Sequence, residues 1–199
     1  MLRLVKRGYF VIALVIGLLI FLKSVDYYSP NFEKGFLIGK SEIFPFYKIL
    51  LYSHIIGAPI ALMTGLFQFT FQQSRQHRKM GLLYVISVLF LAGPGGLGMS
   101  FFALGGLINT LNFLLLSILW ILTTFLAFYY AKRKDYAKHR SMMIRSFILT
   151  NSAILIRLFS YINHQLLIFE PETGYTVISW LSWLPTLLIY EILQIKKRT

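Results

Sequence analysis

Residues 139–164 read HRSMMIRSFILTNSAILIRLFSYINH, an apolar segment that is long enough to cross a bilayer and yet contains two arginines. At about 1.5 Å of rise per residue, one helix over this segment would separate its terminal histidines by about 37 Å, against a hydrocarbon core of about 30 Å. We expect one face of this helix to look into the protein, because polar and small residues recur along it at spacings of three, four or seven. That face carries His139, Ser146, Thr150, Ala153, Arg157, Ser160 and His164.

The composition of the whole chain is that of a membrane protein. Of its 199 residues, 57% are hydrophobic and only 14% are charged. The hydrophobic share exceeds that of ordinary soluble domains. The length leaves room for about six spans with short loops and for no additional soluble domain. The sequence therefore predicts an all-α fold, a polytopic helical bundle that forms a single membrane domain over residues 1–199.

Six apolar segments are expected to cross the bilayer, and the second to the fifth of them form the expected core at about residues 46–167. The first span follows three basic residues, and no clear small-x-small cleavage site comes after it, so we interpret it as an uncleaved anchor. The spans cover about residues 9–22, 46–71, 80–104, 107–130, 139–167 and 175–193.

The basic residues predict how these spans are oriented. Fourteen of the 20 lysines and arginines lie before the first span, in the links around Arg78 and Lys134, or in the C-terminal tail. Because basic loops stay in the cytoplasm, we expect both termini to be cytoplasmic and the protein to lie in the cell inner (cytoplasmic) membrane. No nucleic-acid partner is expected, since the basic residues follow no single solvated face and no binding motif accompanies them.

Several reaction classes find no support in the residue types. The chain has no cysteine, which excludes disulfides, thiolate metal sites and cysteine nucleophiles. There is no nucleophile motif, phosphate loop or dinucleotide fingerprint, and the spans with histidines lack the carboxylates of a zinc hydrolase. Classical hydrolase and kinase chemistry is therefore disfavoured, and whether the protein is an enzyme stays open.

A ligand site is predicted in the outer half of the bundle, between the second and fifth spans. His54 and Arg157 lie about 12 and 15 Å from the outer surface by the helical rise, and no span supplies a carboxylate at that depth. Because a buried arginine needs an anion, a carbonyl or water, the expected ligand is a quinone, a haem propionate or a lipid headgroup. In the alternative, Ser, Asn and main-chain oxygens satisfy Arg157, or it reaches outward. The ligand-binding candidates are His54, Gln68, Arg157 and His164.

A second set of candidates lies at the inner membrane boundary, in the strings RQHRKMG and KHRSMMIRS. Three arginines there could together bind an anionic lipid headgroup or a phosphate. The alternative is that they only anchor the helices by their positive charge. The candidates are His77, Arg78, His139, Arg140 and Arg145.

The four histidines form an outer and an inner pair, which makes them candidate ligands of haem b. The outer pair, His54 and His164, differs in depth by about 8 Å by the helical rise, whereas bis-histidine ligation needs equal depth. The inner pair, His77 and His139, matches in depth but lies in basic links, where histidine is ordinary. No other metal or cofactor is assigned.

The third span contains the cluster GPGGLG at residues 93–98. A proline among glycines in mid-span loosens or breaks a helix, and freed backbone groups must then face protein or water. Two interpretations stay open: a broken helix that lines a cavity, or a kinked helix that packs closely against a neighbour.

Three strings carry a resemblance to a known family: H-x6-ALMTGLFQF from His54, HRKMG from His77, and HRSMMIRSFILT from His139 with a later Leu-Ile-Arg at Arg157. Over roughly residues 52–157 the chain resembles a bacterial family of predicted multi-span membrane proteins known only as a domain of unknown function. A more distant likeness to four-helix b-type cytochromes rests on the number and sidedness of the histidines. The family resemblance implies importance, without a reaction, for His54, Gln68, His77, Arg78, Gly81, His139, Arg140, Arg145 and Arg157.

Three classes of function follow. The first is a redox protein linked to a quinone or to haem, with its ligand site between the second and fifth spans. The second is a carrier of lipid or small molecules, in which the glycine cluster and the polar face of the fifth span line a pathway. The third is a non-catalytic membrane partner whose polar faces only pack helices. The ligand, the reaction and the oligomeric state stay open.

Overall fold

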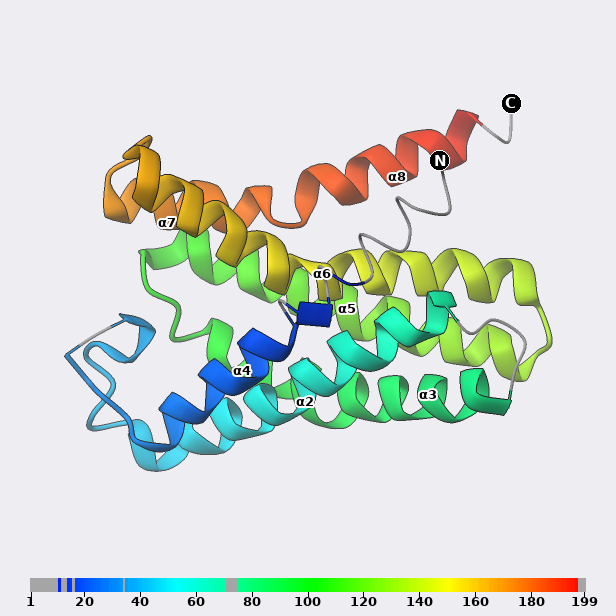
Figure 1. The fold of residues 1–199 in the computed structure, drawn as a ribbon, viewed down its shortest axis with the longest axis horizontal. Coiled ribbons are helices and arrows are strands. Elements are labelled where there is room, and N and C mark those ends of the chain that lie inside the picture. Colours follow the sequence, from blue (N-terminus) through cyan, green and yellow to red (C-terminus); the bar gives the residue numbers. More distant parts are fainter. Residues whose placement is uncertain (1–10, 12–13, 16, 34, 71–74, 197–199) are drawn as a thin grey trace. The chain divides into compact units, whose positions relative to one another are not determined.

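A computed structural model describes residues 11, 14–15, 17–33, 35–70 and 75–196. Within these residues the fold is all-α, with no strand (Figure 1). Of the first predicted span, about residues 9–22, residues 9–10, 12–13 and 16 lie outside them. Five helical stretches are long and apolar enough to cross a membrane, which confirms a polytopic helical bundle: Phe44–Gln68, Arg75–Ser100, Gly106–Lys132, Tyr136–Leu166 and Pro171–Lys196.

The chain divides into two compact units, Met1–Met99 and Ser100–Thr199, here the first and second unit. The prediction of one membrane domain stays a prediction. The first unit holds the short helices η1 (Val25–Tyr28) and η2 (Gly35–Leu37), then α2 (Phe44–Thr70), α3 (Arg75–Ile86), the π-helix η3 (Ser87–Ala92) and α4 (Gly93–Ser100). The second unit holds α5 (Gly106–Lys132), α6 (Tyr136–Leu166), α7 (Pro171–Leu181) and α8 (Leu184–Lys196).

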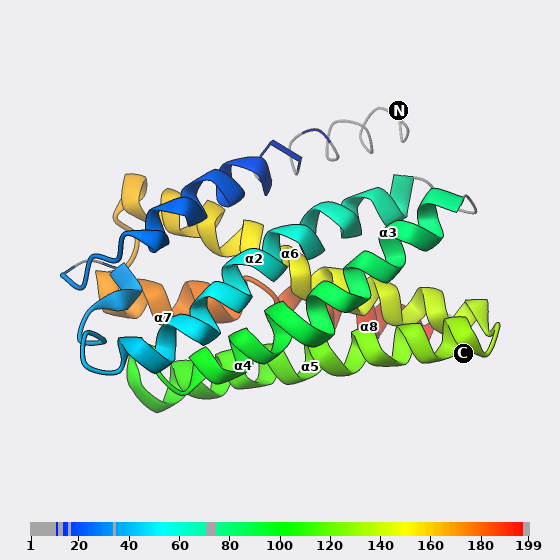
Figure 2. The same ribbon diagram turned by 90° about the horizontal axis from the view of Figure 1, so that it is seen from below.

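In the first unit, α3, η3 and α4 run back along α2 as one helical path (Figures 1 and 2). The π-turn precedes Pro94, and the amide of Gly93 bonds to the carbonyl of Val88, five residues earlier. A methyl group on Gly95 would lie 2.7 Å from the Leu50 carbonyl oxygen and 2.9 Å from the main-chain nitrogen of His54. Of the two interpretations of the glycine cluster, the close-packed helix is therefore the one found, since small residues let helices approach closely.

In the second unit, α5 and α6 lie antiparallel and share buried polar side chains. The hydroxyls of Thr124 and Ser146 are 2.6 Å apart, and the Trp120 indole donates to the Thr150 hydroxyl at 2.9 Å. Outside the span, Asp135 caps α6 by accepting from the Lys138 amide at 3.1 Å, and the hydrogen bond from the Lys138 side chain lowers the pKa of the Asp135 carboxyl.

The predicted inward face of α6 is buried in its first half only. Ser146 and Thr150 are buried as expected, but Arg157, Ser160 and His164 are exposed, which corrects the prediction for the outer half. α7 packs near the C-terminal end of α6 and the N-terminal end of α5. The Asn109 amide of α5 donates to the Thr176 hydroxyl of α7 at 3.0 Å, and nearby aromatic rings of α5 and α7 are also in contact.

The sixth span consists of two helices, α7 and α8, with a break at Ser182 and Trp183 (Figure 1). Pro185 follows the break, and its missing N–H cannot pair with the Leu181 carbonyl, so a continuous helix is interrupted there. Among the described spans, the sixth is thus the one that is broken, whereas the third, for which a break and a kink were both open, continues through a π-turn.

Candidate functional site

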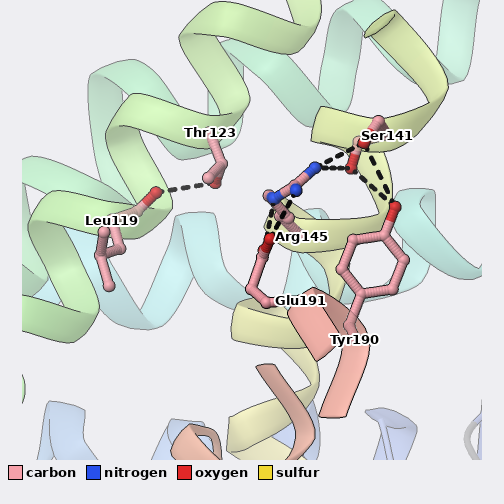
Figure 3. A network of polar contacts seen from close by, with 6 residues as sticks. All are labelled: Leu119, Thr123, Ser141, Arg145, Tyr190 and Glu191. Atoms are coloured by element: carbon pink, nitrogen blue, oxygen red, sulfur yellow. Dashed lines mark hydrogen bonds and ion pairs between the residues drawn. The ribbon is translucent and has the colours of Figure 1, made fainter. Parts of the chain in front are cut away.

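The clearest concentration of charge inside the spans is an ion pair between α6 and α8 (Figure 3). Arg145 donates from Nε to Oε1 of Glu191 at 2.6 Å and from Nη2 to Oε2 at 2.7 Å. Two parallel charge-assisted hydrogen bonds of this kind fix both the distance and the orientation of the partners. The side chains are 14% and 38% exposed, so the arginine is the more enclosed of the two.

Ser141 and Tyr190 complete this group, which we call the inner cluster: Ser141, Arg145, Tyr190 and Glu191. Arg145 Nη1 donates to the Ser141 hydroxyl at 2.5 Å and to its carbonyl at 3.2 Å. The guanidinium lies 5.0 Å from the centre of the Tyr190 ring, and the Tyr190 hydroxyl lies 3.3 Å from that of Ser141 (Figure 3). The cation is thus held by a carboxylate, a serine and an aromatic face.

This arrangement changes what Arg145 can do. The sequence made it an inner-boundary anion site together with Arg78 and Arg140, both of which are exposed. The protein itself supplies an anion to Arg145, so a phosphate or headgroup would have to compete with Glu191. Neither Glu191, Ser141 nor Tyr190 was predicted as part of a site. The available signal was that Glu191 is a lone carboxylate at the inner end of its span, on the same side as Arg145.

Two of the candidate histidines are oriented by main-chain carbonyls of a neighbouring helix. His54 Nδ1 lies 2.8 Å from the Ala92 oxygen in η3, and His139 Nδ1 lies 2.8 Å from the Ala127 oxygen in α5. A carbonyl oxygen only accepts, so Nδ1 must carry the proton in both rings. In the neutral imidazole the lone pair is then on Nε2, and ring orientations of this kind are typical of histidines that bind metals.

The other candidates lie as follows. Gln68 is buried and donates to the His77 carbonyl at 2.9 Å, and Gly81 packs against its amide. Gln68 thereby joins the end of α2 to the start of α3. Arg157 is exposed and donates from Nη1 to the Ala153 carbonyl at 2.8 Å, one turn earlier on α6. His164 lies exposed in the last turn of the same helix.

Neither unit alone brings two histidines together. Fourteen residues of α2 separate His54 from Gln68, about 21 Å of helix, before His77 is reached. His139 and His164 are about 37 Å apart along α6. The described residues also contain no group of three or more His, Asp or Glu that could hold a metal ion. Pairing of His54 with Arg157 or His164, or of His77 with His139, takes one residue from each unit and stays a prediction.

The sequence profile of a family described as "Predicted membrane protein (DUF2306)" matches residues 51–194. This covers almost three quarters of the chain and includes the sixth span, beyond the region over which the resemblance had been seen. No curated protein and no solved structure matches the chain. The comparisons therefore support the family and give no support to the likeness to b-type cytochromes.

Proposed function

Because the chain belongs to the DUF2306 family of predicted membrane proteins, whose function is unknown, we propose from its own side chains that it binds a redox ligand of the membrane. The ligand is haem b or a quinone. The observation that carries this proposal is the pair of imidazoles, His54 and His139, each fixed by a main-chain carbonyl at 2.8 Å. We further propose that the protein resides in the cell inner membrane, with His139 near its cytoplasmic face.

The chemistry of these rings suits either ligand. With its proton on Nδ1, an imidazole can bind haem iron through Nε2 or can accept the hydroxyl proton of a quinol there. The hydrogen bond to the carbonyl also restricts rotation of the ring, so less entropy is lost when a ligand binds. Arg140 follows His139 directly and would favour an anionic propionate or a partly reduced quinone.

The test is an absorption spectrum of the purified protein, oxidised and reduced, together with mass spectrometry of extracted quinones. We expect either a Soret band or a bound quinone in wild type and its loss in at least one of His139→Gln and His54→Gln, which then identifies the ring that binds. Tyr161→Phe is the control, because this side chain of α6 is 65% exposed and belongs to no candidate set, and it should keep the ligand. A protein that is colourless and quinone-free as isolated, and that binds neither added haem nor added quinone, would refute the proposal.

A second candidate is a non-catalytic membrane partner protein, and a specific observation favours it. Arg145 has its counter-ion in Glu191, and the hydroxyls of Thr124 and Ser146 bond to each other. Polar residues that satisfy one another act as contacts between helices. The carrier class receives less support, because the third span packs closely against α2: Gly57 of α2 lies against Leu91 and Ala92, and Gly95 lies against Leu50 of α2.

A further inference from the structure

Two fully buried asparagines lie one turn apart on α5, at the end of the helix that α7 covers. Asn109 and Asn112 are both 0% exposed. The Asn109 amide nitrogen donates to the Leu104 carbonyl at 2.8 Å and to the Thr176 hydroxyl at 3.0 Å. The Asn112 amide oxygen accepts from the Trp183 indole nitrogen at 2.8 Å. Each amide is therefore held by one end.

These partners fix which way round each amide lies. The Leu104 carbonyl can only accept, so Asn109 must present its nitrogen to it. The Trp183 indole can only donate, so Asn112 must present its oxygen. Rotating either amide by 180° would place two donors or two acceptors against each other, which excludes the usual exchange of oxygen and nitrogen.

The opposite ends of the two amides are buried without a partner among the described residues. They are Oδ1 of Asn109, an acceptor, and Nδ2 of Asn112, a donor. A buried polar atom with no hydrogen bond is costly, and at membrane depth bulk water cannot satisfy it. Residues three apart on a helix lie on neighbouring parts of its surface, about 5–6 Å between their Cβ atoms. One small molecule can therefore reach both atoms.

The surroundings restrict the size and charge of such a molecule. The break of the sixth span contributes Trp183, which is 2% exposed, and Ser179 and Ser182 nearby on that span are also buried. Gly105, with φ of 85°, leaves space for the Asn109 amide that a side chain would occupy. No charged side chain takes part in these contacts. A small neutral molecule that both donates and accepts suits these two atoms, and water is the smallest such molecule.

We propose that one water molecule bridges Asn109 Oδ1 and Asn112 Nδ2 and is a permanent part of the second unit. The water donates to the oxygen and accepts from the nitrogen, so both unpaired atoms are satisfied. It joins two amides whose other ends bind Thr176 of α7 and Trp183 at the break. The sixth span is thereby attached to α5 through a hydrated contact, independently of any ligand at the histidines.

X-ray radiolytic labelling tests this directly in the full-length protein. Short X-ray pulses convert bound water to hydroxyl radicals, which oxidise the side chains next to it, and mass spectrometry locates the products. Trp120 is the internal control, because it is 7% exposed and its indole donates to the Thr150 hydroxyl inside the protein. We expect Trp183 to be oxidised several-fold more than Trp120 although it is the more deeply buried indole.

Two variants assign the label to the bridging position. Asn109→Leu removes the acceptor and leaves the bond between Trp183 and Asn112, so oxidation of Trp183 should fall to the level of Trp120. Thr176→Val is the matched control, since it removes a partner of Asn109 and keeps both bridging atoms; it should retain the label. Equal oxidation of Trp183 and Trp120 in wild type would overturn the proposal, and this comparison decides alone if Asn109→Leu does not fold.

Discussion

Arg145 and Glu191 join α6 to α8 through two parallel hydrogen bonds of 2.6 and 2.7 Å. All residues of α8 are described, and none of them is buried. The last helix is therefore held to its neighbour by the inner cluster more than by enclosed apolar side chains. An unpaired arginine or glutamate within an apolar span would raise the free energy of the folded protein, and the ion pair offsets this cost for both residues.

The first prediction is that Glu191→Leu is more harmful than the double substitution Arg145→Leu/Glu191→Leu. The single variant leaves a cation in an apolar span without its anion, whereas the double variant leaves neither charge. We expect the single change to cost about 2 kcal/mol, less than the roughly 3–5 kcal/mol of a fully buried pair because Glu191 is 38% exposed. Unfolding in detergent with increasing denaturant measures this. Arg145→Leu completes the cycle, and a loss in the double variant equal to the sum of the two single losses would contradict the coupling.

The second prediction concerns the contact between α2 and the third span. Gly95→Ala should lower the free energy of unfolding by about 2 kcal/mol, because the added methyl meets main-chain atoms that cannot move aside. Gly98→Ala is the matched control, since the three atoms nearest to its methyl all belong to the flexible Leu50 side chain. Thermal melts of the two variants should differ clearly. Equal losses would mean that α2 can shift as a whole.

The third prediction is the orientation of the spans. Reporter domains fused after residue 30 and after residue 172 should be outside the cytoplasm, and fusions at the C-terminus should be inside, because the basic links are held on the cytoplasmic side. At each fusion point, the ratio of the activity of a periplasmic reporter to that of a cytoplasmic reporter shows on which side of the membrane the residue lies. A cytoplasmic signal at residue 30 or residue 172 would overturn the six-span arrangement.

The fourth prediction concerns the outer-half ligand candidates. Arg157→Gln keeps hydrogen-bonding capacity and removes the cation, so it should leave the protein folded and abolish binding of a quinone, haem or lipid that co-purifies. Arg157→Leu should be neutral or stabilising if the arginine only packs, because an apolar side chain suits the span. Mass spectrometry of bound small molecules compares these variants with His54→Ala. The same species at the same occupancy in all of them would exclude a site at these residues.

The second to the sixth spans were predicted to within about five residues of the helical stretches found, because length and apolar content dominate membrane insertion. The place of the helix break could not. Gly93 to Gly98 have low helix propensity, but contact with α2 keeps them helical and the π-turn accommodates Pro94. Pro185 has no such turn before it, and the sixth span breaks. Low helix propensity marks both the glycine cluster and Pro185 in the sequence. Whether the helix continues or breaks there depends on packing against the neighbouring helices.

The histidines and arginines were recognised as candidates, but their partners were not. Rise per residue gives the depth of a side chain and leaves open which neighbouring helix it faces. The bonds of His54 to Ala92 and of His139 to Ala127 use main-chain oxygens, which carry no mark in the sequence. Glu191 was visible at the right depth for Arg145. The side of α8 on which Glu191 lies depends on the helix break at Ser182 and Trp183, which only the structure reveals.

The π-turn also marks the place where the third span can lose a residue. A π-turn holds one residue more than an α-turn, so deleting one residue from Ser87–Ala92 would restore regular α-helix and leave Gly95 facing α2. A deletion in the regular helix on either side has no wide turn to absorb it. Every residue beyond such a deletion would rotate by about 100°, since an α-helix has 3.6 residues per turn, and a larger side chain than Gly95 would meet the Leu50 carbonyl. Within this helical path, the loss of one residue is therefore tolerated at the π-turn and not beside it.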